Sequence, residues 1–384
     1  SASFSMGDVT AYVPLLNTDS GGVDGGTAIQ TSGSTRLAKF DVDGAIGPLA
    51  AYADLAAELG DTHVLADGDG IQLGRSARLF GQHVYLPREG VAVHVNAFNF
   101  PAWGLAEKAA TALLAGMPVV SKPATSTALV AFRIAEILVE DKALPEGAFS
   151  FVCGGAGDLL DRLGGQDVLA FTGSSTTASK LREGKGVVAR ATRINVEADS
   201  LNAAVLGPDV EAGSEVMNLF VNDVAKEMTQ KTGQKCTAVR RIYVPRRRAS
   251  EVIELLRERL AAVKVGDPTR EEVTMGPLAT AAQLRDVREG VKKLESCATI
   301  VFGSAAEVSA IGAPAGKGFF ISPILLLGSS PKAGDAVHTH EVFGPVATVM
   351  PYDSPAEAVA LVAAGGGGLV TSIYSDDKDV VRTL

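Results

Sequence analysis

Cysteine is scarce in this sequence, with three in 384 residues, and the three are widely spaced. An odd, scattered set of thiols provides neither a disulfide framework nor the paired Cys motif of a zinc site. Such usage suits a reducing compartment. Because no basic, apolar and small-residue signal opens the chain, we expect the protein in the cytoplasm.

Long apolar runs and an excess of positive charge are also missing. The longest apolar runs, such as residues 324–327, are far shorter than the roughly 20 residues needed to cross a bilayer. The formal net charge of -9 argues against a nucleic-acid-binding surface. The one basic cluster, Arg240-Arg241 with Arg246-Arg247-Arg248, brackets an apolar run. It has two interpretations, a solvated strand edge or a local site for phosphate groups.

The chain does contain a regular alternation of apolar segments. Hydrophobic residues make up 46% of it, which is enough for two domains with separate cores. Strand-like runs alternate with helix-like runs through short connections, a pattern typical of doubly wound parallel sheets. We therefore predict an α/β fold with two doubly wound domains. The expected strands are 91–95, 118–121, 149–152, 168–171, 203–206, 241–244, 299–302, 321–327 and 347–350, and the expected long helices are 105–114, 127–139, 216–229, 250–263 and 280–294.

The domain limits follow from this alternation. Residues 1–32 are rich in Ser, Gly and Thr and are left unplaced, residues 33–206 form the first domain, and residues 207–384 form the second. In the first domain, residues 41–59 have the spacing of an amphipathic helix. Residues 76–88 alternate as the strands of an exposed hairpin arm do.

One cysteine is placed as a reactive thiol would be. Cys236 follows a helix-like run and Gly233, so it lies where the backbone must turn. A nucleophilic cysteine needs partial exposure and a field that favours the thiolate, which Lys231 and Lys235 could supply. The alternative is that Cys236 is a small buried apolar residue.

Two further candidates follow strand-like runs. Asn99 comes after 90–95, and Glu197 comes at the end of 190–196. Working groups in parallel sheets usually lie at such strand ends. A thiol, a carboxylate and an amide together form a site for covalent carbonyl chemistry, facing a cleft shared by the two domains. The alternatives are a turn residue before Pro101 for Asn99 and a surface carboxylate for Glu197.

Six short segments, in order along the chain, carry a resemblance to a known family. They are Asn99-Phe100-Pro101, Lys122-Pro123-Ala124, Phe171-Thr172-Gly173-Ser174, Glu197, Gly233-Gln234-Lys235-Cys236 and Glu341-Val342-Phe343-Gly344-Pro345. With them the chain resembles the aldehyde dehydrogenase superfamily. The stretches 196–202 and 233–241 are similar to the branch that acts on CoA-linked semialdehydes in phenylacetate and benzoate breakdown.

The resemblance implies a role for each catalytic candidate. Cys236 is the nucleophile that forms a thiohemiacetal with the aldehyde, and hydride then leaves to a nicotinamide. The Asn99 amide and the backbone N–H of Cys236 hold the oxyanion, and Glu197 activates the water that releases the acid. Two alternatives stay open. One is an acylating enzyme, in which CoA attacks the thioester and which the presence of Glu197 disfavours; the other is a non-catalytic module of a larger protein.

The resemblance also implies cofactor contacts. The matching positions are Phe98, Lys122, Gly173, Ser174, Glu341 and Phe343. NAD-preferring members commonly carry a glutamate at the position of Thr125, where a carboxylate would repel the 2′-phosphate of NADP. We therefore expect NADP to be preferred over NAD. The glycine-rich stretch 151–157 is a weak candidate for facing a pyrophosphate, and within it Cys153 is interpreted as a packed core thiol.

Metal binding and assembly complete the expectations. His338 and His340 lack a third ligand and helical spacing, so we predict no metal site. By resemblance the arm is an inter-subunit element of a homodimer or homotetramer, and the chain stops short of the end of the catalytic domain. The expected partner is therefore a small aldehyde, with no nucleic acid and no membrane.

Overall fold

A computed structural model describes residues 35–384, with side chains from Lys39 onward. The unplaced segment 1–32 lies outside the described residues. Contacts divide the described chain into two compact units, Phe40–Ala198 and Asp199–Leu384. The division falls earlier than the predicted limit at residue 206, because the strand at 203–206 pairs within the second unit.

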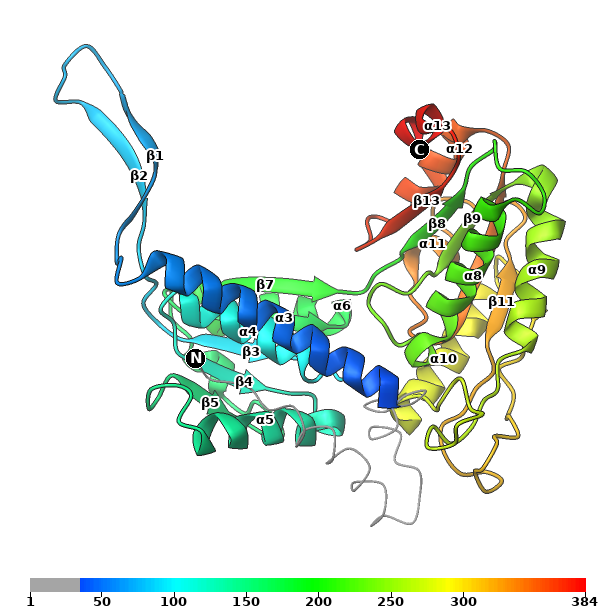
Figure 1. The fold of residues 1–384 in the computed structure, drawn as a ribbon, viewed down its shortest axis with the longest axis horizontal. Helices are drawn as coiled ribbons and strands as arrows, with labels where there is room; N and C mark the ends of the chain where they lie inside the picture. Colours follow the sequence, from blue (N-terminus) through cyan, green and yellow to red (C-terminus); the bar gives the residue numbers. More distant parts are fainter. Residues whose placement is uncertain (1–34) are drawn as a thin grey trace. The chain divides into compact units, whose positions relative to one another are not determined.

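The first unit is built on a five-stranded parallel sheet with the order β5-β4-β3-β6-β7 (Figure 1). From β3 the chain steps outward through β4 to β5, and then returns to the other side of β3 to form β6 and β7. The strand order therefore reverses between β3 and β6. The strands are β3 (Ala92–Val95), β4 (Val119–Lys122), β5 (Phe149–Phe151), β6 (Val168–Gly173) and β7 (Arg193–Ala198).

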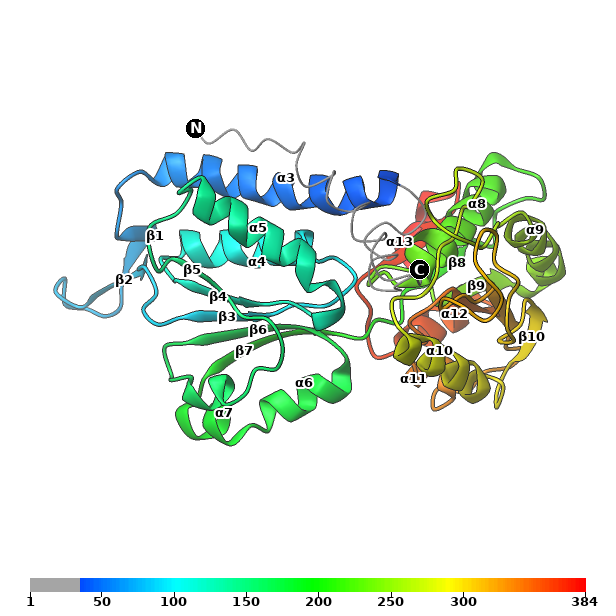
Figure 2. The same ribbon diagram turned by 90° about the horizontal axis from the view of Figure 1, so that it is seen from below.

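Helices cover both faces of this sheet (Figure 2). One face carries α3 (Thr35–Leu59), α4 (Trp103–Leu114) and α5 (Ala128–Glu140), and the other carries α6 (Ser175–Arg182) and α7 (Lys185–Arg190). Alanines at the contact, including Ala92, Ala109 and Ala131, are buried. Their small side chains let helix and sheet approach closely. The 3-10 turns η1 (Thr125–Thr127) and η2 (Leu159–Arg162) complete the connections.

A two-stranded antiparallel arm extends away from the sheet of the first unit (Figure 1). It consists of β1 (Leu65–Gln72) and β2 (Phe80–Tyr85). The predicted range, 76–88, covers only its second strand. The first strand was missed because Gly68 and Gly70 interrupt its apolar alternation. Its predicted inter-subunit role stays a prediction.

The second unit contains a six-stranded sheet with the order β10-β11-β12-β9-β8-β13. All pairs are parallel except β10 with β11. The strands are β8 (Ala203–Leu206), β9 (Arg241–Pro245), β10 (Thr299–Phe302), β11 (Ile324–Leu327), β12 (Val346–Tyr352) and β13 (Thr371–Tyr374). The helices are α8 (Glu215–Thr229), η3 (Gln230–Gly233), η4 (Arg246–Arg248), α9 (Ala249–Ala261), α10 (Ala281–Leu294), α11 (Ala336–Thr339), α12 (Pro355–Ala363) and α13 (Lys378–Thr383).

Two apolar cores enclose this second sheet. Residues of α8 and α9, such as Phe220 and Leu256, pack in one core, and residues of α10 and α12, such as Val291 and Ala358, pack in the other. The predicted α/β class is thus confirmed. Within residues 35–384, no helix is long and apolar enough to cross a membrane.

Candidate active site

The register of the first sheet gathers predicted site residues along one edge. Val95 pairs with Lys122 on one side and Phe171 on the other, and Thr172 pairs with Glu197. In a parallel sheet these positions are the carboxyl ends of neighbouring strands. They also flank the reversal of strand order between β3 and β6, where open α/β sheets bind their ligands.

The loop that carries Asn99 is anchored by a helix that is far from it in the sequence. Asn99 is buried in the connection between β3, which ends at Val95, and α4, which begins at Trp103. The carboxylate of Asp41 on α3 accepts hydrogen bonds from the backbone N–H groups of Ala102 (3.1 Å) and Trp103 (3.0 Å). These N–H groups lack partners within the helix, and a carboxylate there also complements the helix dipole. Asp41 therefore positions the Asn99 segment.

The sequence contained one signal for Asp41 that was not used. This acidic residue lies on the buried face of an amphipathic helix, four residues before the buried Ala45. A buried carboxylate needs hydrogen-bond partners, so such an acid indicates a specific contact. Which N–H groups it meets could not be read from the helix alone.

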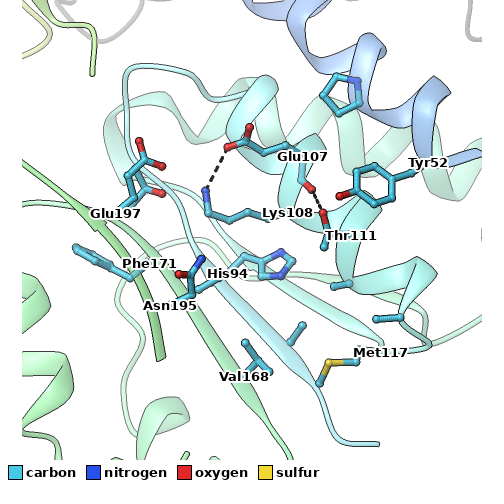
Figure 3. A pocket seen from close by; sticks show the side chains of 16 residues that line it. Tyr52, His94, Glu107, Lys108, Thr111, Met117, Val168, Phe171, Asn195 and Glu197 are labelled. Atoms are coloured by element: carbon cyan, nitrogen blue, oxygen red, sulfur yellow. Dashed lines mark hydrogen bonds and ion pairs between the residues drawn. The ribbon is translucent and has the colours of Figure 1, made fainter. Parts of the chain in front are cut away.

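Glu197 lines a pocket within the first unit (Figure 3). The pocket has a volume of about 570 Å³, and its polar wall also includes His94, Glu107, Lys108 and Asn195. The Lys108 ammonium lies 3.8 Å from the Glu107 carboxylate. Burial raises the pKa of Glu107, Lys108 lowers it, and the neighbouring Glu197 raises it. Glu197 is thus half-buried at the wall of this pocket.

His94 should make the folded protein more sensitive to acid. Its side chain is 2% exposed, and burial followed by the charge of Lys108 lowers the pKa from 6.5 to about 4. Because the folded pKa is depressed, the neutral ring contributes stability that is complete above pH 6.5 and is lost as pH falls toward 4. Between pH 7 and pH 5 the loss due to His94 should be about 2 kcal/mol. Urea unfolding of wild type and His94→Gln at both pH values measures it.

The control for this prediction is His83→Gln, which removes an exposed histidine of the arm. His83→Gln should lose as much stability between pH 7 and pH 5 as wild type does. His94→Gln should lose less, whatever its stability at pH 7. An equal loss in His94→Gln and wild type would contradict the assignment.

The predicted cofactor contacts of the first unit lie on the same sheet edge. Lys122 ends β4 and is half-buried, and Thr125 follows it in η1 with an exposed side chain. Ser174 caps α6, with its Oγ accepting from the N–H of Thr177 at 3.3 Å. The N-terminus of α6 therefore directs backbone N–H groups to the edge where β6 ends, a favourable place for a phosphate. A Cβ at Gly173 would lie 2.5 Å from the Phe171 ring, so a larger residue there would have to displace that ring. The amine of Lys122, the hydroxyl of Thr125 and the N-terminus of α6 are groups that fit a dinucleotide cofactor.

The glycine-rich stretch 151–157 does not share these features. It follows β5, the edge strand, and leads into η2, a 3-10 helix of four residues. Such a short helix has too small a dipole to attract a pyrophosphate, so the structure does not support that interpretation. Cys153 is exposed, and its interpretation as a packed core thiol is wrong. The chain leaves the core as soon as this edge strand ends.

In the second unit, Cys236 follows a left-handed turn. Helix α8 ends at Thr229, and Lys231, Thr232 and Gly233 have φ values of 52°, 55° and 67°. Side chains resist this conformation, so tertiary contacts must hold it. The Thr232 hydroxyl supplies one by donating to the carbonyl of Gly276 at 2.9 Å. The Cys236 thiol that follows is half-buried, which excludes a fully buried apolar residue.

Asn202 fixes the backbone at this thiol and just after it. Its side-chain amide donates to the carbonyls of Cys236 (2.8 Å) and Ala238 (2.9 Å). Its Oδ1 accepts from the N–H groups of Leu369 (3.1 Å) and Val370 (3.0 Å). The loop that carries Cys236, called the nucleophile loop below, is therefore tied to the residues just before β13. Asn202 was part of the sequence motif, but its role could not be read there.

The predicted lysine field is compensated at Lys235. Its ammonium lies 2.6 Å from the Glu227 carboxylate and 3.1 Å from the Gln230 side-chain oxygen. Both interpretations of the basic cluster are wrong for Arg240 and Arg241, which are 4% and 2% exposed and donate to backbone carbonyls.

Two of the remaining arginines of the cluster have acidic partners. Arg246 lies 2.7 Å from Asp353. Arg248 pairs with Glu211 and, at 3.2 Å, with Glu251. These acidic partners disfavour a phosphate site, because an anion would be repelled by them. Arg247 instead donates to the carbonyl of Pro208.

Glu341 is a buried carboxylate with a partner on each oxygen. Oε1 accepts from Arg240 Nε at 3.3 Å, and Oε2 accepts from the N–H of Ser200 at 3.0 Å. Burial raises the pKa of Glu341, while Arg240 lowers it. The Phe343 ring stacks near the same guanidinium, whose carbon lies 5.4 Å from the ring centre. Glu341 and Phe343 are thus held on one segment of the second unit.

The two histidines of this segment lie in α11 and just after it. His338 is buried in α11, and burial followed by Arg241 lowers its pKa. In the part of the chain that the structure describes, no group of three or more His, Cys, Asp or Glu side chains could hold a metal ion.

Comparison with known proteins decides the family. The sequence model that describes the aldehyde dehydrogenase family matches residues 25–384 of this chain. The chain belongs to the aldehyde dehydrogenase family. It is 47% identical to 3,4-dehydroadipyl-CoA semialdehyde dehydrogenase of Aromatoleum evansii, over 93% of this chain and 70% of that protein. It is 29% identical to lactaldehyde dehydrogenase of Escherichia coli, over 86% of this chain and 65% of that one.

Solved aldehyde dehydrogenases share the fold. The NAD-dependent aldehyde dehydrogenase of Sinorhizobium meliloti has a TM-score of 0.79 at 21% identity, covering 98% of this chain and 70% of that one. Succinic semialdehyde dehydrogenase of Streptococcus pyogenes, solved with NADP+, has a TM-score of 0.78 at 21% identity, covering 98% and 78%. The aldehyde dehydrogenase family, the fold and an activity that oxidises an aldehyde with a nicotinamide cofactor are thereby confirmed.

Proposed function

We propose that this aldehyde dehydrogenase oxidises a CoA-linked semialdehyde to the carboxylic acid and uses NADP in preference to NAD. The substrate class is supported by the 47% identity, over 93% of the chain, to a relative whose name specifies a CoA semialdehyde. The half-buried thiol of Cys236 and the pocket beside Glu197 support the covalent chemistry.

The mechanism assigns one step to each residue. The Cys236 thiolate attacks the aldehyde carbon, forming a C–S bond and an oxyanion that accepts hydrogen bonds from the Asn99 amide and the N–H of Cys236. A nicotinamide held at the cofactor positions would supply the hydride acceptor, and loss of hydride from that carbon would leave a thioester on Cys236. Glu197 then takes a proton from the water that attacks the thioester, and the C–S bond breaks to release the acid and the thiolate.

The same site could transfer the acyl group to free CoA instead of water. Glu197 argues against this acylating alternative, because a half-buried carboxylate that lines a pocket is suited to activating water. A screen tests both the reaction and the substrate class. CoA-linked semialdehydes and simple aldehydes are each incubated with NADP or NAD, and the absorbance of the reduced nicotinamide is followed. Oxidation that requires free CoA, or simple aldehydes as the better substrates, would contradict the proposal.

Thr125→Glu should shift the cofactor preference toward NAD. The Thr125 side chain is exposed at the carboxyl end of β4, close in sequence to Lys122, so no carboxylate there opposes a 2′-phosphate. Introducing one should lower the kcat/KM ratio of NADP to NAD by at least about tenfold, or about 1.4 kcal/mol. The matched control is Thr125→Gln, which adds the same bulk without charge. A wild-type enzyme that strongly prefers NAD would contradict the choice of NADP.

The arm supports assembly into a homodimer or homotetramer. Large apolar side chains on and beside it are exposed, among them Ile71, Phe80 and Leu86. Monomers rarely expose so many together, and burial against another copy would remove them from water. Cytoplasmic location is proposed from the sequence, whose three scattered cysteines suit a reducing compartment.

A further inference from the structure

Arg240 is a buried cation that the reaction scheme above leaves without a role. Its side chain is 4% exposed at the residue that precedes β9. A buried charge is costly unless it is paired and its N–H groups are satisfied, so the protein must use the contacts that it makes.

These contacts reach two separate segments of the second unit. Towards the nucleophile loop, Nη2 donates to the carbonyl of Gly233 at 2.8 Å and, at 3.4 Å, to that of Lys235, the residue before Cys236. Towards the other segment, Nη1 donates to the carbonyl of Gly344 at 2.8 Å and Nε donates to Glu341 at 3.3 Å. One planar guanidinium therefore spans both segments, which a lysine could not do.

The two segments also touch directly. A Cβ at Gly233 would lie 2.2 Å from the carbonyl oxygen of Gly344, and Gly233 has a φ of 67°. The backbones are packed against each other at a point that only glycine permits. Arg240 joins them by hydrogen bonds beside this contact.

We propose that Arg240 is a positioning residue that couples the nucleophile to the cofactor-binding carboxylate, holding the loop of Cys236 and the side chain of Glu341 with one shared positive charge. This inference rests on the proposed function and on the contact between Glu341 and the cofactor that the family resemblance implies. Arg240 has three acidic neighbours that interact with its charge, Glu341, Cys236 and Glu227. Glu227 is also paired with Lys235. Cys236 and Glu341 therefore share Arg240, and removing either charge changes the field at the other.

The pH dependence of thiol alkylation tests the shared charge without aldehyde or cofactor. The protein is treated with iodoacetamide between pH 5 and pH 10, and the modification of Cys236 is followed by mass spectrometry of its peptide, since Cys153 and Cys297 are also free thiols. Arg240→Met should raise the midpoint of the curve of Cys236 alkylation against pH by about one pH unit, because the thiolate loses the positive charge that stabilises it. Glu341→Gln should lower this midpoint, because the Glu341 carboxylate no longer competes with the Cys236 thiolate for the charge of Arg240. Simple loosening of the loop would not produce opposite shifts.

Steady-state kinetics tests the positioning. Arg240→Lys keeps the positive charge but loses the planar guanidinium that donates to both segments. It should therefore raise the KM of the cofactor by about tenfold. The alkylation midpoint should stay near that of wild type. Arg241→Lys is the matched control. Arg241 is equally buried, but it donates to the carbonyls of Leu201 and Val362 and to neither segment. It should lower the Tm without raising the KM of the cofactor.

The outcomes are separable. Shifts in the same direction for Arg240→Met and Glu341→Gln, or unchanged midpoints, would overturn the shared charge. If Arg240→Met does not fold, a Glu341→Gln midpoint at or above that of wild type overturns it instead. Equal KM changes in Arg240→Lys and Arg241→Lys would overturn the positioning role. Opposite midpoint shifts in a protein that oxidises no aldehyde would support the coupling while refuting the proposed function.

Discussion

Replacing Cys236 with alanine should abolish aldehyde oxidation while leaving cofactor binding near normal. The thiol is the group that bonds to substrate, and no other nucleophile of the scheme replaces it. The side chain is half-buried at a loop and not part of either apolar core, so its loss should cost little stability. Turnover should fall by at least about a thousandfold, measured as reduced nicotinamide formed in the steady state. Binding of the cofactor to the variant is measured by titration.

The two other cysteines provide matched controls. Cys153→Ala removes an exposed thiol and Cys297→Ala removes a half-buried one, and both should retain activity. Cys236→Ala with more than about one part in a thousand of wild-type turnover would show that Cys236 is not the nucleophile. Loss of activity in a control variant with Cys236 intact would point to another thiol.

Replacing Glu197 with glutamine should slow hydrolysis of the thioester more than hydride transfer. The amide keeps the size of the side chain but cannot take the proton of the attacking water. The hydrolytic step should slow by about two to four orders of magnitude, the usual contribution of a general base. Stopped-flow mixing should then show a rapid burst of reduced cofactor followed by slow turnover, because the acyl group accumulates on Cys236.

A second pocket residue separates the role of Glu197 from a general change of charge. Glu107→Gln removes the other carboxylate of the same pocket and should produce no burst. If the burst rate in Glu197→Gln falls as far as the steady-state rate, Glu197 instead serves the earlier steps, for example by activating the thiol.

Short-range pattern was enough to locate most elements of this fold. The expected helices 105–114 and 216–229 correspond to α4 and α8, and the expected strand 168–171 lies within β6. Periodicity works here because helices and strands bury one face, and the residues of that face are close together in sequence. The conspicuous exceptions are β1 and β13, which border glycine-rich stretches and have little apolar alternation.

Sequence motifs also located the candidate site residues, but not what surrounds them. The strand-end positions of Asn99 and Glu197 followed from pattern alone. The pairing of Thr172 with Glu197, and the pocket that Glu197 shares with His94 and Glu107, depend on how strands are ordered in the sheet. Strand order is set by contacts among all the strands, so no single strand specifies it.

The chain by itself determined the α/β class, the motif order and the residue types of the candidate site. Only the tertiary structure decided which charges are buried and with what they pair. Arg240 resembled an exposed basic cluster because its neighbours in sequence are arginines, yet its partners include Gly344, about a hundred residues away. Asp41 similarly meets Ala102. Desolvation and hydrogen bonding act between atoms that are close in space, and those distances do not exist until the chain has folded.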